Sequence, residues 1–226
     1  AEELSKFADI LEKAKDFDSA LQALVCDTLT NHQRIIFNGN GYSDEWKEEA
    51  AKRGLSNLSS TAEALPRYIS PENIALVTKH GIYTEQEFRA RYEIHLQNYN
   101  KLINIEARTM SDMVTHQILP AAMQYSSDLA ESINRKAAAS DGSLACSAEK
   151  ALLNSLSVFS DALYHDCEQL NEHLQKVPAN SRAAMDYYSE IIVPAMAVIR
   201  KNADKLESLT AKSYWPYPTY SDILYY

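Results

Sequence analysis

The chain has 226 residues, 46% of them hydrophobic, with five glycines and seven prolines, a composition that suits a sizeable core and long helices. Its formal net charge of −9 argues against nucleic acid and anionic membrane surfaces as partners, and no apolar run reaches the roughly 18 residues of a membrane-spanning helix. Three cysteines without a C-x-x-C pair are typical of a reduced, cytoplasmic protein.

Residues 1–32 predict two helices. Leu4 opens an apolar series at helical spacing, and Asp16 or Asp18 can cap a second helix whose apolar side extends to Leu29. The sequence has no initiator methionine, and its first residues resemble the interior of a helix. We therefore expect the chain to be a piece of a longer protein.

Residues 33–83 predict a connector built from a turn and short helices. The sequence Arg-Ile-Ile-Phe at residues 34–37 is a β-branched and aromatic run, which predicts a short extended segment. Ser43 can cap the helix that follows, and Gly54 can end it. Prolines and a further glycine punctuate the remainder, so we expect only short helical pieces there.

The turn Gly39-Asn40-Gly41 precedes that helix and suggests a phosphate site, because free N–H groups point outward at a helix N-terminus. However, neither G-x-G-x-x-G nor a Walker-type sequence is present. Asp44 and Glu45 in the first helical turn already complement the helix dipole and would repel a phosphate. We therefore favour a purely structural turn.

The chain is expected to be organised around one long helix from Thr84 to about Arg135. Thr84 and Glu87 form a capping-box sequence at its start. Pro120 removes one backbone hydrogen bond and is expected to kink the helix. An apolar stripe follows one face at helical spacing. It comprises Phe88, Tyr92, Tyr99, Leu102, Ile103, Met110, Met113 and Val114.

Three polar residues, His95, Glu106 and Gln117, fall in the same stripe at intervals of eleven. Eleven residues make three helical turns, so these side chains align along the helix axis. One interpretation is a functional polar seam. The other is a structural network in which Glu106 meets an Arg or Tyr of a neighbouring helix, and we favour it because buried polar groups are usually satisfied for structural reasons.

The second half of the chain predicts an antiparallel helix pair. A small, polar stretch at residues 136–146 predicts an exposed loop, and leucines at threes and fours predict a helix over residues 147–175. Ser181 can cap the last helix, which Pro194 interrupts. A heptad pattern follows that helix and predicts coiled-coil-like packing. Its members are Met185, Ile192, Ile199 and Leu206.

The aromatic tail, residues 214–226, contains two prolines that favour an extended path. Left free, its rings would form an exposed apolar patch, so we expect it to dock on its own domain or on a neighbouring subunit. The fold class is therefore all-α. It combines a long kinked central helix, an antiparallel helix bundle, one short extended segment near residues 34–37 and an extended tail.

The sequence supplies no recognisable catalytic chemistry. It contains no G-x-S-x-G, H-E-x-x-H or E-x-x-H sequence. His165, Asp166, Cys167 and the nearby His173 are the densest group of metal-capable side chains. Consecutive helical residues point in different directions, so these groups are not expected to share one ion. We assign no catalytic, cofactor-binding or metal-binding residue within the chain.

Several phrases resemble the C-terminal region of type III glutamine synthetases, and they occur in that family's order over nearly the whole chain. The longest is RIIFNGNGYSDEW at residues 34–46. The shorter ones are ALP at 64–66, RYEI at 91–94, INIEA at 103–107, QILPA at 117–121, LAESIN at 129–134 and WPYPTY at 215–220.

This resemblance implies a bacterial, ATP-dependent parent ligase that condenses glutamate with ammonia, uses Mg²⁺ or Mn²⁺ and forms stacked hexamers. Residues 1–32 then resemble the end of the catalytic domain, residues 33–83 a connector, and residues 84–226 a helical C-terminal domain for assembly or regulation. The family's ATP, metal and catalytic residues would lie upstream, so the segment alone is expected to be inactive. The alternative is a stand-alone helical module for protein–protein interaction.

Overall fold

The computed structural model describes residues 2–218 and 220–224, and these residues form helices, turns and loops without a β-strand. The all-α fold class is therefore confirmed. The chain divides into two compact units, Ala1–Ser59 and Ser60–Tyr226. The boundary falls inside the stretch that the sequence suggested as a connector.

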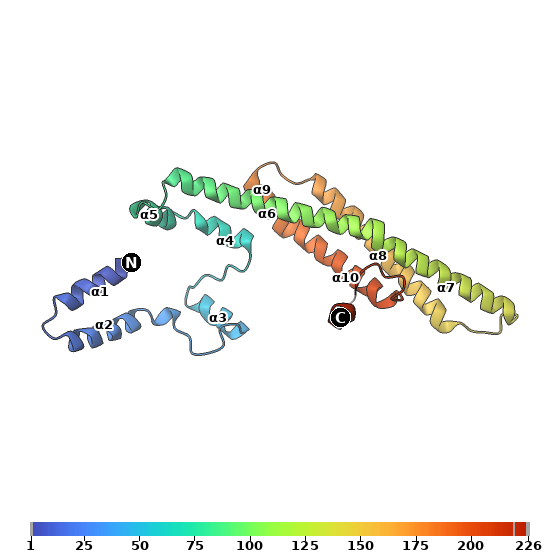
Figure 1. The fold of residues 1–226 in the computed structure, drawn as a ribbon, viewed down its shortest axis with the longest axis horizontal. Coiled ribbons are helices and arrows are strands. Elements are labelled where there is room, and N and C mark those ends of the chain that lie inside the picture. Colours follow the sequence, from blue (N-terminus) through green and yellow to red (C-terminus); the bar gives the residue numbers. More distant parts are fainter. Residues whose placement is uncertain (1, 219, 225–226) are drawn as a thin grey trace. The chain divides into compact units, whose positions relative to one another are not determined.

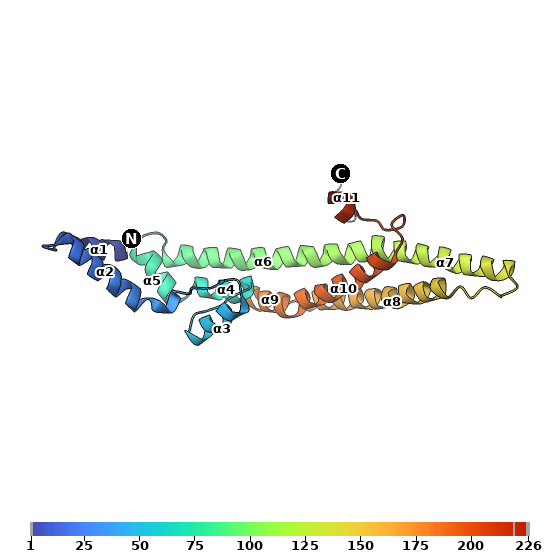
Figure 2. The same cartoon turned by 90° about the horizontal axis from the view of Figure 1, so that it is seen from below.

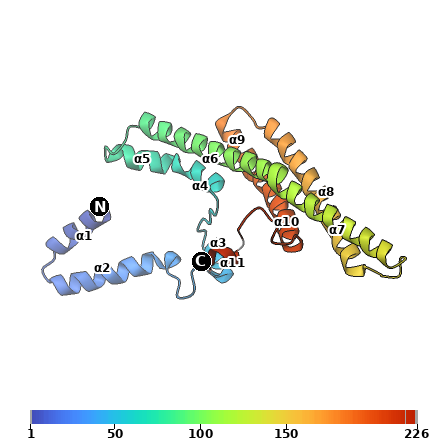
Figure 3. The ribbon, with the colours of Figure 1, turned by 45° about the vertical axis from the view of Figure 1, so that its right-hand side comes forward.

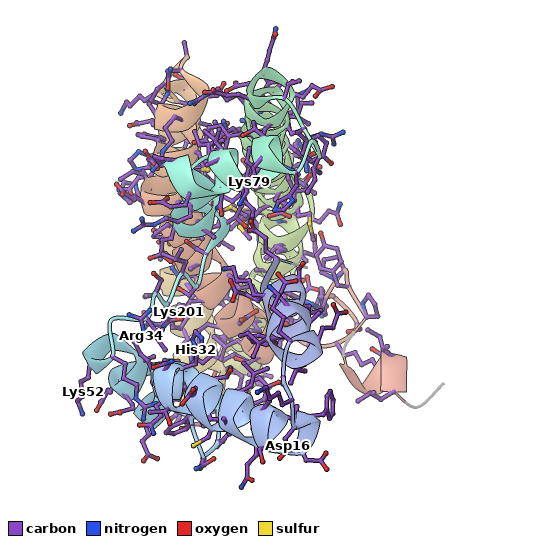
Figure 4. The ribbon with its side chains drawn as sticks, turned by 90° about the vertical axis from the view of Figure 1, so that its left-hand side faces the viewer. Asp16, His32, Arg34, Lys52, Lys79 and Lys201 are labelled. Atoms are coloured by element: carbon purple, nitrogen blue, oxygen red, sulfur yellow. The ribbon has the colours of Figure 1, made fainter. Side chains whose placement is uncertain are left out.

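The first unit contains three α-helices and one short 3₁₀ turn (Figure 1). They are α1 (Glu2–Glu12), α2 (Phe17–Asn31), η1 (Gln33–Ile35) and α3 (Asp44–Lys52). In Figure 4 the labels of Asp16 and His32 mark the two ends of α2. Asp16 is the N-cap residue of α2, although its side chain makes no capping hydrogen bond to the backbone.

The expected extended segment at residues 34–37 is shorter than the sequence suggested. Arg34 and Ile35 lie in η1, and the extended conformation begins only at Ile36. The cause is a tertiary contact, because the Arg53 guanidinium donates to the carbonyl oxygens of Gln33, Arg34 and Ile36 at 3.4, 3.4 and 2.7 Å. A curled backbone brings these three acceptors to one donor group, which a straight strand could not do.

The second unit begins with two short helices, α4 (Thr61–Tyr68) and α5 (Pro71–Lys79), and continues into the long rod. The rod consists of α6 (Glu85–Met113), the π-helical turn η2 (Val114–Ile118) and α7 (Leu119–Ala139). Its predicted capping box is confirmed: Thr84 Oγ1 accepts from the Glu87 N–H, and the Glu87 carboxylate accepts from the Thr84 N–H. These bonds satisfy two of the N–H groups that a helix start leaves unpaired.

A π turn, η2, precedes Pro120 and accommodates this proline within the rod. Pro120 has no N–H, and its ring would crowd the carbonyl four residues earlier, which lies in η2. A π turn accommodates the proline because it widens the helix locally. The same solution recurs at Pro194, which follows the π turn η3 (Tyr188–Ile192).

The rest of the second unit packs back along the rod. It comprises α8 (Ser147–Gln175), α9 (Ser181–Tyr187), η3, α10 (Val193–Leu209) and α11 (Tyr220–Leu224). Figure 2 and Figure 3 show α8 returning antiparallel to α7, with α9 and α10 running back beside it. Asn180, rather than Ser181, caps α9, because its side chain accepts from two backbone N–H groups. Ser181 instead donates to the Glu93 carboxylate on α6.

The bundle core confirms the heptad prediction. Met185, Ile192, Ile199 and Leu206 are all fully buried. The last three share one core cluster with leucines of α8 spaced seven apart, whereas Met185 belongs to a separate cluster with Ala62 and Leu96. The leucines of α8 are Leu156, Leu163 and Leu170. Burial of each such side chain contributes on the order of 1.5–3 kcal/mol, so this seam is the main source of the bundle's stability.

The aromatic tail docks on its own unit over the part that the structure describes. Trp215 and Tyr217 pack against the bundle core, and the Tyr214 ring lies 5.0 Å from that of Tyr125 on α7. The expected extended path is wrong at Tyr220–Leu224, because these residues form the helix α11. Thr219, Tyr225 and Tyr226 belong to the predicted tail but lie outside the described residues.

Candidate functional site

The proposed polar seam does not face the core. His95, Glu106 and Gln117 are all exposed, and the residues that follow them, Leu96, Ala107 and Ile118, are buried instead. The polar series is thus rotated by one position, about 100° around the helix. The structural interpretation, in which a buried Glu106 meets an Arg or Tyr, is wrong because Glu106 is exposed, whereas the functional interpretation stays a prediction. Leu102, which the sequence placed in the apolar stripe, is likewise 52% exposed.

The metal-capable side chains of α8 make separate contacts. His165 Nε2 lies 3.0 Å from the Gln169 amide, and Asp166 accepts from Asn202 on α10 at 2.6 Å. His173 Nδ1 lies 3.3 Å from the Tyr187 hydroxyl. Cys167 is buried beside Ser111 of α6, 3.2 Å away. Within the described residues no group of three His, Cys, Asp or Glu side chains is arranged to hold a metal ion.

The turn before α3 is closed by its own side chains. Asn40 Oδ1 accepts from the Tyr42 N–H at 3.0 Å, and Ser43 Oγ donates to the Asn40 carbonyl at 2.8 Å. Asp44 pairs with Lys47 at 2.7 Å in the first turn of the helix. These contacts support the structural interpretation of the turn, because one of its N–H groups is bonded and a carboxylate stands where an anion would bind.

The clearest cavity lies in the second unit, between the rod and α10, and we call it the tail groove. Its volume is about 680 Å³, within the range of small-molecule sites. Met110 and Met113 of α6 and Met196 and Ile199 of α10 form part of its apolar lining. Trp215 and Tyr217 of the aromatic tail line it as well, so the tail is part of the cavity wall.

Acidic side chains also line the tail groove. Glu106 comes from α6, and Asp204 and Glu207 come from α10. Arg200, the single basic residue in the lining, donates to Asp204 at 2.6 Å. Among residues 2–218 and 220–224, neither Glu106 nor Glu207 has an ion-pair or hydrogen-bond partner. The groove therefore combines an apolar lining with negative charge.

The tail itself carries two perturbed phenols. A hydrogen bond to the Asp128 carboxylate raises the pKa of Tyr214 above its usual 10.0. Burial, and then the charge of Asp112, raise the pKa of Tyr217. The buried Tyr217 hydroxyl has no hydrogen-bond partner among the described residues, although it lines the tail groove. Buried hydroxyls are usually satisfied, so this unpaired group is an exception within the tail.

Sequence reasoning did not identify the tail groove, because its walls bring α6 and η2 together with α10 and the tail, which lie far from them in the chain. The only sequence signal was the cluster of rings in the aromatic tail, which predicted docking without specifying where. No helix in the described part of the chain has the length and apolar character to cross a membrane.

Comparisons with known proteins point to one family. The family model described as the glutamine synthetase C-terminal domain matches residues 20–137, more than half of the chain. A glutamine synthetase of Butyrivibrio fibrisolvens is 40% identical over 201 residues, which cover 88% of this chain and 29% of that protein. A type-3 glutamine synthetase of Dictyostelium discoideum is 35% identical over 222 residues, covering 94% of this chain and 30% of that protein.

A glutamine synthetase of Bacteroides fragilis (strain YCH46) is 28% identical over 222 residues, covering 96% of this chain and 30% of that protein. The chain thus spans less than a third of the length of these relatives.

Proposed function

The chain belongs to the glutamine synthetase family, and on this premise we propose that it is the C-terminal part of a type III glutamine synthetase. The whole enzyme would condense glutamate with ammonia at the expense of ATP, in the cytoplasm. ATP and Mg²⁺ or Mn²⁺ would be bound by sequence outside this chain, since the relatives are more than three times as long.

Within that enzyme, we propose that the segment serves assembly or regulation rather than catalysis. The observation that carries this role is the first unit, whose helices α1 and α2 contain no buried residue. Leu4 is 69% exposed and Phe17 is 55% exposed, and several other large apolar side chains of these two helices are also exposed to solvent. An apolar face of this kind marks a surface that other protein covers, and both the parent's catalytic domain and a neighbouring subunit would make it a contact surface of the assembled enzyme.

The second unit supports the same role in a different way. It has its own buried core, so it can project from an enzyme as a self-supporting bundle. The bundle and the aromatic tail then offer large surfaces through which subunits of a homo-oligomer could meet. Stacked hexamers, as the family resemblance implies, are the assembly that we propose.

Two measurements test the proposal. The 226-residue chain alone should form no glutamine from glutamate, ammonia, ATP and Mg²⁺ or Mn²⁺, whereas the full-length enzyme should. Replacing Leu4 and Phe17 by Ser in the full-length enzyme should alter its assembly, measured by light scattering after gel filtration. Turnover by the chain alone would show that catalytic residues lie within it, and an unchanged oligomer would remove the assembly role of this face.

A further inference from the structure

We propose that the tail groove is a binding site for a small organic cation, an alkylammonium ion with an apolar body. The site would be separate from glutamine formation, and the inference does not depend on the proposed ligase function. It stands on three features of the groove: an apolar lining, aromatic rings contributed by the tail, and carboxylates without a partner.

The apolar lining selects the body of the ligand. Met110, Met113 and Met196 line the groove together, and methionine side chains adapt to irregular apolar shapes because they are unbranched and polarizable. The groove, about 680 Å³ in volume, is partly open, and removing part of the ligand's apolar surface from water favours binding.

The carboxylates select the sign of the charge. Glu207 is half-buried and Glu106 is exposed, and both line the groove without an ion-pair partner in the described part of the chain. The only guanidinium of the lining, that of Arg200, already pairs with Asp204. The carboxylates would repel an anionic ligand. A cationic ligand would supply the positive counter-charge that Glu106 and Glu207 lack, and this charge complementarity would make the groove specific for cations.

The tail supplies the remaining contacts. Trp215 and Tyr217 lie with their ring centroids 6.4 Å apart and at 72°, so two aromatic surfaces with different orientations border the groove. Aromatic faces attract ammonium groups. The tail therefore contributes aromatic surface to the groove beside the carboxylates of α6 and α10.

Charge also distinguishes an ammonium ion from other small occupants. The carboxylates of the groove would repel an anion. A neutral apolar molecule would use the lining but leave Glu207 without a counter-ion. These alternatives give different outcomes in one titration.

The test uses the full 226-residue chain with Trp46→Phe, which leaves Trp215 as the only tryptophan. Octylammonium, octanoate and 1-octanol share one alkyl chain and differ in charge. We expect octylammonium to change Trp215 fluorescence saturably, with an affinity at least about tenfold higher than that of octanoate or octanol.

The variant Glu207→Gln keeps the shape of the side chain and removes its charge, so it should weaken octylammonium binding by about tenfold while leaving octanol unaffected. The matched control Glu168→Gln makes the same change on an exposed position of α8 outside the groove and should have no effect. Unfolding midpoints of all variants establish that each remains folded. Equal binding of the three probes, no saturable binding, or equal effects of both glutamine variants would overturn the proposal.

Discussion

Truncating Leu163 should destabilise the bundle strongly, and the expected size follows from its surroundings. The side chain has 0% exposure at the middle of α8 and belongs to the core cluster with Ile199 and Leu206. Leu163→Ala removes three carbon atoms, whose transfer from water contributes about 2 kcal/mol at roughly 0.8 kcal/mol for each. The cavity left behind adds to this, so we expect a total loss of about 3–5 kcal/mol.

Leu102→Ala is the matched control, because it makes the same chemical change on a residue that the apolar pattern alone would place in the core. Leu102 is 52% exposed in the structure, so the substitution loses part of the transfer term and opens no enclosed cavity. We expect it to cost less than about 1 kcal/mol.

Urea unfolding followed by Trp215 fluorescence, with Trp46→Phe in every variant, reports on the second unit alone because Trp215 packs on its core. If the free energy of unfolding depends on urea concentration with the same slope in each variant, the shift in the unfolding midpoint gives the change in that free energy. The reasoning would be refuted if Leu102→Ala cost as much as Leu163→Ala, or if Leu163→Ala cost less than about 1 kcal/mol.

Three further predictions concern the caps, the cysteines and the tail. Thr84→Ala removes the hydroxyl that accepts from the Glu87 N–H at the start of α6 and should lower the free energy of unfolding by about 1 kcal/mol, whereas no measurable change in urea midpoint would contradict the cap's role. Cys26 is exposed and Cys167 is buried, so a maleimide should label the first in the native chain and the second only after unfolding, and peptide mass spectrometry distinguishes them. The hydrogen bond to Asp128 raises the pKa of Tyr214 in the folded state. The stabilisation that this bond gives the folded state is therefore complete below pH 10.0, and it is lost as the pH rises through the folded-state pKa. In Asp128→Asn the pKa of Tyr214 should fall, so an ultraviolet titration of tyrosinate should show one fewer tyrosine with a raised pKa than in the unsubstituted protein. An unchanged titration would exclude this coupling.

Features set by neighbouring residues could be predicted from the sequence. The capping box of Thr84 depends on residues three apart, and the seven-residue spacing from Met185 to Leu206 depends on helical geometry alone, so both are present as expected. The effect of Pro120 also follows from its own covalent structure, although the π turn that accommodates it was not anticipated. Such features are determined by local sterics and hydrogen bonding.

The tertiary structure decided which face of each helix is covered. The apolar pattern of α6 is broad, so it is compatible with either Glu106 or Ala107 facing the core. In the structure α6 contacts α8 and η3, and Ala107 is the residue that is buried. The same holds at residues 34–37, where a distant arginine curls a segment of high strand propensity. The tail groove exists only because α6 and η2 meet α10 and the tail, which lie far from them in the chain, and burial of that kind depends on partners that local sequence does not encode.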